Sequence, residues 1–144
     1  MADHTEEQVV VESQYYSLLK EPANHLAILL FHSETTPDAF RKSMHLLLEQ
    51  SKKYSISNWL IFCGKRCCFT TDDIHWTEDE VVPRVVKELE LQRIAIVESP
   101  EHVDRFNLMA LFDALSSISE TDIQFFEKEK NARTWLREDS NLNF

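Results

Sequence analysis

The chain has 144 residues, of which 43% are hydrophobic and 28% charged, a composition typical of one globular domain covering residues 1–144. The net charge of −10 argues against binding to nucleic acid or to anionic membranes, because phosphate contacts need clustered lysine and arginine. The N-terminus lacks a signal-peptide pattern, and the longest aliphatic and aromatic run, residues 26–31, is too short to span a bilayer. We therefore expect a cytoplasmic protein without membrane insertion.

The first part of the chain is predicted to form two strands and a helix. Residues 9–20 carry apolar side chains on one side and a mixture on the other, which is typical of a strand at a sheet edge or in an antiparallel pair. A turn signal at 21–24 precedes the apolar run of 25–32, which predicts a strand covered on both faces. The two strands should form an antiparallel hairpin. Thr36 is expected to cap the next helix, with Pro37 at its first position.

The middle of the chain is predicted to form a strand at 59–63 and a helical region after it. Either Thr70 or Thr71 should start a short helical turn, and Thr77 with the acidic residues after it forms a capping-box pattern for a second one. Pro83 lies inside the apolar pattern of that second helix. Since proline removes one backbone hydrogen bond, it should bend the helix or mark its true start.

A fourth strand is predicted at 93–98, followed by a strong helix start at Ser99 and Pro100. The helix running from there to about residue 117 is apolar on nearly all sides. Such a helix is either deeply buried or a contact surface for a partner, and the sequence leaves both interpretations open. The candidate interface residues are Leu108, Leu111, Phe112 and Leu115.

The end of the chain predicts a fifth strand at 122–127, at an edge of the sheet, and a last helix at 128–139. One hairpin followed by consecutive right-handed crossovers gives a single mostly parallel sheet whose first strand is antiparallel. The predicted fold class is therefore α/β, with a five-stranded sheet and about four helices.

Three stretches carry a resemblance to a known family: WTEDEVVPR at 76–84, RIAIVESPEH at 93–102 and NARTWLR at 131–137. With the order of elements, they resemble the STAS-like domains of an uncharacterised bacterial branch, relatives of the anti-sigma-factor antagonists. The resemblance implies a STAS fold and a non-catalytic domain that acts through protein contacts, for example in regulation. Regulatory STAS domains carry a phosphorylated serine after the third strand. This chain has GKRCCFTT there, at 64–71, with Thr70 and Thr71 in a similar position.

Polar side chains follow the predicted parallel strands at the sheet edge where an open α/β sheet usually forms its ligand crevice. The candidate crevice residues are His32, Ser33, Thr70, Thr71, His75, Ser99 and His102. They could equally be scattered polar residues of the rim. Cys63, Cys67, Cys68 and His75 lack the C-x-x-C spacing of structural zinc sites, so we expect no metal, no cofactor and no assigned catalytic residue.

Three functional hypotheses follow from the sequence. The first is a domain that acts through protein contacts, as a homodimer that uses the 100–117 helix and with an unidentified protein partner. The second is a small carrier of an apolar ligand, held in a pocket beside the same helix. The third is an enzyme that uses Cys67 or Cys68 as a nucleophile, because Lys65, Arg66 and a following helix start could lower a thiol pKa there.

Overall fold

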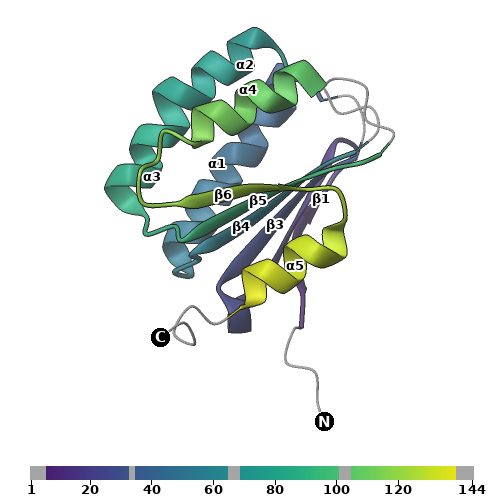
Figure 1. The fold of residues 1–144 in the computed structure, drawn as a ribbon, viewed down its shortest axis with the longest axis vertical. Helices are drawn as coiled ribbons and strands as arrows, with labels where there is room; N and C mark the ends of the chain where they lie inside the picture. The colour runs from purple at the N-terminus through teal and green to yellow at the C-terminus, as the bar shows by residue number, and fades with distance from the viewer. Residues whose placement is uncertain (1–5, 33–34, 65–68, 101–104, 139–144) are drawn as a thin grey trace.

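The computed structural model describes residues 6–32, 35–64, 69–100 and 105–138, and its six strands form one mixed sheet in the order β1-β2-β3-β4-β5-β6 (Figure 1). The strands are β1 (Gln8–Glu12), β2 (Tyr16–Glu21), β3 (Leu26–Phe31), β4 (Asn58–Cys63), β5 (Arg93–Glu98) and β6 (Asp122–Phe126). The helices are η1 (Pro22–Asn24), α1 (Pro37–Lys53), α2 (Thr71–Trp76), the π-helical η2 (Thr77–Val81), α3 (Val82–Glu88), α4 (Arg105–Leu115) and α5 (Glu129–Arg137). The predicted α/β class with a mostly parallel sheet is confirmed.

The sheet has one more strand than predicted, because residues 9–20 form two strands and not one. A tight turn separates them: the Ser13 amide donates to the Tyr16 carbonyl oxygen at 2.9 Å, and the Tyr16 amide donates to the Ser13 hydroxyl at 3.2 Å. The polar and apolar alternation continues across this short turn, so the sequence pattern does not show the break. β1 and β2 pair antiparallel, and β2 and β3 form the predicted hairpin.

From β3 onward all pairs are parallel and consecutive in the chain. A right-handed crossover to the neighbouring strand places its helix on the same face each time. Accordingly, α1 to α4 lie together on one face of the sheet, and among the described helices α5 alone covers the other (Figure 1). Within the described residues, no helix is long and apolar enough to cross a membrane.

Threonine side chains cap two of the helices. Thr36 caps α1 as predicted, because its hydroxyl accepts a hydrogen bond from the Ala39 amide at 3.1 Å and Pro37 takes the first position. Thr70 caps α2 in a capping box with Asp73. The predicted capping box at Thr77 is wrong: the helical path has already begun, and the buried Thr77 hydroxyl donates to the Asp73 carbonyl oxygen at 2.9 Å.

Pro83 was predicted to bend the helix or to mark its true start, and α3 begins beside it within a helical path that continues from α2 through η2. α3 begins at Val82, and proline sits within its first two positions. The turn before it, η2, is π-helical. Since Pro83 has no amide hydrogen and its ring collides with the carbonyl four residues earlier, the regular α-helical ladder cannot pass through this point, and the widened turn accommodates the change.

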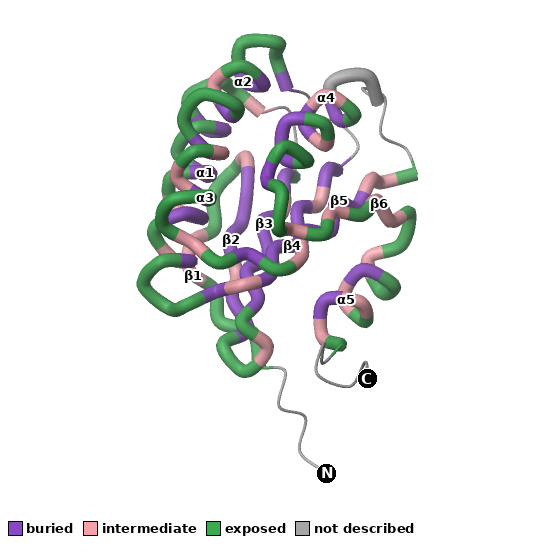
Figure 2. The backbone as a smooth tube through the Cα atoms, turned by 60° about the vertical axis from the view of Figure 1, so that its left-hand side comes forward, coloured by how far each residue is buried: buried purple, intermediate pink, exposed green. Residues whose placement is uncertain are grey.

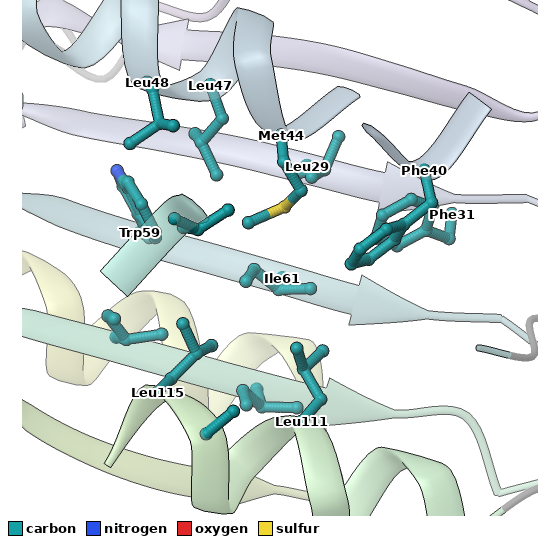
Figure 3. Close-up of a cluster of buried hydrophobic side chains, with 14 of the residues drawn as sticks. Leu29, Phe31, Phe40, Met44, Leu47, Leu48, Trp59, Ile61, Leu111 and Leu115 are labelled. Atoms are coloured by element: carbon teal, nitrogen blue, oxygen red, sulfur yellow. The ribbon is translucent and has the colours of Figure 1, made fainter. Parts of the chain in front are cut away.

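The main core fills the space between the sheet and α1–α4. Figure 3 shows Met44, Leu47 and Leu48 of α1 and Leu111 and Leu115 of α4 gathered over the same face of the sheet. The inner strands β2 to β5 are largely buried, whereas the outer sides of the helices are exposed (Figure 2). The predicted strands at 25–32, 59–63 and 93–98 thus correspond to central strands buried on both faces.

Candidate functional site

His32 and Ser99 occupy one row at the carboxyl end of the parallel strands. The register aligns Phe31, Cys63 and Glu98 as the last residues of β3, β4 and β5. His32 and Ser99 follow the outer two of these strands, so their backbones lie about 10 Å apart, two strand spacings. The register therefore places these two candidate residues in one row, and a ligand crevice there stays a prediction. Ser33 and His102 lie outside the described residues, so their place in a ligand crevice stays a prediction.

The middle of this row is Gly64, the only glycine of the chain. Its amide donates to the Phe31 carbonyl oxygen at 3.1 Å, and a Cβ atom at this position would lie 2.7 Å from that oxygen and 3.3 Å from the His32 carbonyl oxygen. No side chain fits there without displacing backbone. Glycine is thus required because the end of β4 approaches the end of β3 closely.

His32 is exposed, and its Nε2 atom lies 2.7 Å from the Ser17 hydroxyl, in hydrogen-bonding contact. A serine hydroxyl bonded to an imidazole is the first element of a nucleophile–base pair. Ser17, however, is only 4% exposed, so its hydroxyl is closed to a substrate in this conformation. We therefore describe the pair as a structural contact that joins β2 to the end of β3. Sequence reasoning missed Ser17 because only the antiparallel β2–β3 register brings it beside His32.

The two candidate threonines and His75 belong to the start of the long helical region. The Thr70 hydroxyl accepts a hydrogen bond from the Asp73 amide, and the Asp73 carboxylate accepts one from the Thr70 amide, both at 3.0 Å. Thr71 is exposed at the first position of α2. The His75 Nδ1 atom lies 3.5 Å from the Glu78 carboxylate, and both side chains are exposed. Of the two threonines predicted to start this helical turn, Thr70 is therefore the one that caps α2.

Ser99 is half-buried, and its amide donates to the Cys63 carbonyl oxygen at 3.0 Å, which continues the parallel ladder past β5. Cys63 itself is fully buried in the main core, as expected for a small apolar strand residue. Cys67 and Cys68 lie outside the described residues, so the cysteine-enzyme hypothesis stays untested. Within the described part of the chain, no group of three or more His, Cys, Asp or Glu side chains could hold a metal ion.

Two open recesses lie at the opposite end of the sheet, beside the amino ends of the parallel strands. The larger, about 500 Å³, lies between the end of α3 and the segment after α4, and the smaller is about 320 Å³. Leu89, Leu91 and Ile118 line the larger one together with the charged Glu90 and Glu120. The apolar-ligand hypothesis places a pocket beside α4, and this recess, which is open and of mixed polarity, lies next to the segment after α4.

The predicted interface helix is largely part of the chain's own core. Leu108, Leu111 and Leu115 of α4 are each at most 1% exposed, so they offer no surface to a second protein in this fold, and their assignment as interface residues is corrected. Phe112 differs: it is half-buried and stacks on Phe125 of β6, with ring centroids 4.8 Å apart and planes within 7°. The sequence could not separate the two faces because both are apolar.

Met109 lies one helical turn before Phe112 on the same side of α4 and is 43% exposed. Below it, Ile123 and Phe125 of β6 are half-buried. We call these four residues, Met109, Phe112, Ile123 and Phe125, the α4–β6 surface. It combines an exposed thioether and an aromatic stack at the edge of the sheet, which are features of protein contact surfaces.

A buried charge holds α5 against the other face of the sheet, and it was also missed. Glu21 is fully buried, and its carboxylate accepts hydrogen bonds from Arg137 at 2.6 and 3.1 Å and from Arg133 at 3.2 Å. Burial lowers the pKa of Arg133, but hydrogen bonds to Glu7 and Glu129 outweigh it and raise the pKa above its usual value. Sequence reasoning treated Glu21 as part of a turn, because its partners are more than 100 residues away in the chain.

No family model matches this chain, and no curated protein sequence matches it either.

Proposed function

We propose that this protein is a non-catalytic STAS-like domain that acts by binding other proteins. Two features support the proposal. The order of one antiparallel hairpin and consecutive parallel βα units fits the resemblance drawn from the sequence. The α4–β6 surface leaves apolar and aromatic side chains partly open to solvent.

The observation that carries the proposal is the stacked pair of Phe112 and Phe125 beside the exposed Met109. Aromatic residues and methionine are enriched in the buried centres of protein interfaces, where they bury a large area at low cost in side-chain entropy. An apolar cluster at the edge of a sheet can also combine side-chain burial with backbone hydrogen bonds to a partner strand.

The proposal is tested by photo-crosslinking in the organism that makes the protein. The photoreactive p-benzoylphenylalanine replaces Met109 in one variant and the exposed Glu49 of α1 in a control variant. We expect protein adducts from position 109 and none above background from position 49, because only the former lies on the α4–β6 surface. Equal yields at both positions, or no adduct at position 109 in well-folded protein, would refute the proposed function.

A further inference from the structure

β6 forms one of the two edges of the sheet. β6 is the last strand in the sheet order, and no described strand lies beyond it. Figure 1 looks towards this edge, with β6 running across the front between α4 above and α5 below. A free edge exposes a row of backbone amide and carbonyl groups that can pair with another strand.

The two edges of the sheet differ in how they are protected. At β1, the register with β2 shifts between Val9 and Val11, which is the irregularity of a bulge. Bulges, prolines and lysines are the usual means of blocking further pairing at an edge. The β6 segment DIQFF contains neither proline nor lysine, and its five residues pair with β5 in uninterrupted register. β6 therefore retains the geometry that strand addition requires.

The backbone directions in β6 are set by its pairing with β5. The Asp122 amide donates to the Gln92 carbonyl oxygen at 2.9 Å, so the backbone groups of Asp122 point towards β5. Because alternate residues of a strand direct these groups to opposite sides, Ile123 and Phe125 direct theirs away from the sheet. Two residues, one on either side of Gln124, thus present backbone donors and acceptors at the free edge.

We propose that a second copy of this chain occupies the edge, with the two β6 strands antiparallel and related by a two-fold axis at Gln124. This inference rests on the proposed function and specifies its partner. The axis at Gln124 uses all five residues of the strand. It pairs Ile123 of each copy with Phe125 of the other, so both outward-facing residues exchange their amide and carbonyl bonds. The product is a continuous sheet of twelve strands, six from each copy.

The side chains suit this register. The two-fold axis stands perpendicular to the sheet, so the same face of both copies meets at the new junction. On the face of α4, Phe125 of one copy lies beside Ile123 of the other, an aromatic and β-branched pair of the kind that stabilises antiparallel strands. The half-buried Phe112 stacks on Phe125 and extends this apolar contact on each side of the axis. On the α5 face, Asp122 lies opposite Phe126, so no like charges face each other within the strand.

Charge favours a second copy over an unrelated strand. Glu120 and Lys128 are both exposed and lie four residues before and after Gln124. An antiparallel pair brings the start of β6 in one copy to the end of β6 in the other, so Glu120 of each copy and Lys128 of the other lie at the same end of the junction. Glu120 lies in the turn before β6 and Lys128 follows a bend at Glu127, so the attraction joins opposite charges at each end of the junction and not paired strand residues. The attraction is local and acts against the net charge of −10 that each copy carries.

Sedimentation velocity across a concentration series tests the dimer. We expect the wild-type protein to show twice its chain mass of 16.9 kDa. Glu120→Lys and Lys128→Glu should each weaken dimerisation about tenfold, because each change turns two attractive pairs into repulsive ones. The double variant Glu120→Lys with Lys128→Glu restores opposite charges and should recover the wild-type affinity. A monomeric wild-type protein, or a dimer that none of these changes affects, would overturn the inference.

A proline variant tests the backbone geometry independently of charge. Ile123→Pro removes an amide that points away from β5, so the dimer should be lost while the circular-dichroism spectrum stays close to wild type and the melting temperature falls only by the loss of the half-buried Ile123 side chain. Gln124→Pro is the matched control: it removes an amide that points towards β5 and should lower the melting temperature clearly. A folded Ile123→Pro protein that still dimerises with wild-type affinity would contradict pairing through β6.

A photo-crosslinker at Gln124 separates this inference from the proposed function. An adduct of two identical chains supports both. An adduct with a different protein keeps the proposed function and overturns the second copy as the occupant of the edge. The absence of any protein adduct at positions 109 and 124 overturns both.

Discussion

The face of the sheet under α1–α4 and the face under α5 bury their side chains by different means. On the first, Phe31, Phe40 and Phe69 meet with ring centroids 5.1 to 6.0 Å apart, inside a cluster drawn from most elements of the chain. On the second, the nine-residue α5 contributes two fully buried apolar side chains, Ala132 and Leu136. The fully buried carboxylate of Glu21 supplements this small contact by binding two arginines of α5.

The two faces show that the folding stability of the domain and the position of one helix can come from different kinds of contact. Apolar burial contributes about 25 cal/mol per Å² and has no direction, so the large core supplies most of the free energy of folding. Hydrogen bonds between arginine and carboxylate are directional but gain little net energy once desolvation is included. We infer that the α1–α4 face provides stability, whereas the Glu21 cluster fixes where α5 sits on the sheet.

Phe40→Ala is expected to have the largest effect, because it removes a fully buried ring from the aromatic cluster of the first face. The free energy of unfolding should fall by about 4 kcal/mol, from lost transfer energy and a residual cavity. Urea denaturation followed by tryptophan fluorescence measures the change. The exposed Val86→Ala serves as a control and should shift stability by about 0.5 kcal/mol or less. A loss below about 1 kcal/mol in Phe40→Ala would refute the dominant role of this face.

Glu21→Ala should cost about 3 kcal/mol, because it leaves Arg133 and Arg137 partly buried beside an empty carboxylate site. Hydrogen exchange should show the loss concentrated in α5, with the amides of β4 and α1 less affected. Glu129→Ala removes a more exposed carboxylate from the same Arg133 and should cost about 0.5 kcal/mol. If Glu21→Ala loosened both faces equally, the positioning role would be wrong.

Gly64→Ala alters the sheet shared by both faces. The new Cβ atom would lie 2.7 Å from the Phe31 carbonyl oxygen, so the ends of β3 and β4 must separate, at a cost of about 2 kcal/mol. Thermal unfolding should show a lower melting temperature, and hydrogen exchange should increase under α1 and under α5 alike. An unchanged melting temperature would mean that this strand end relaxes without resistance.

Thr70→Ala should have the smallest effect, about 1 kcal/mol, because it removes one cap at the start of α2 and leaves the core intact. Thr70→Ser keeps a hydroxyl that can accept from the Asp73 amide and should remain near wild type. Chemical denaturation of both variants measures the difference. Equal loss in both would show that the hydroxyl contact is not what stabilises this helix start.

Patterns within one segment were predicted well from the sequence. The apolar runs of β3, β4 and β5, the capping of α1 by Thr36 and the interruption of the regular helix near Pro83 all depend on residues close in the chain. The position of 122–126 at an edge of the sheet was also predicted. The turn at Ser13 was missed because an alternating pattern on both of its sides resembles one long strand.

The sequence by itself determined which segments from β3 onward are strands and helices, that these strands run parallel, and the need for a buried apolar face, since local propensity and periodicity specify these. Only the tertiary structure decided which side of α4 is buried, that Ser17 meets His32, and that Glu21 receives Arg133 and Arg137. The reason is physical: these contacts join residues far apart in the chain. Which distant side chains meet depends on the register and packing of the whole sheet, and no local pattern encodes it.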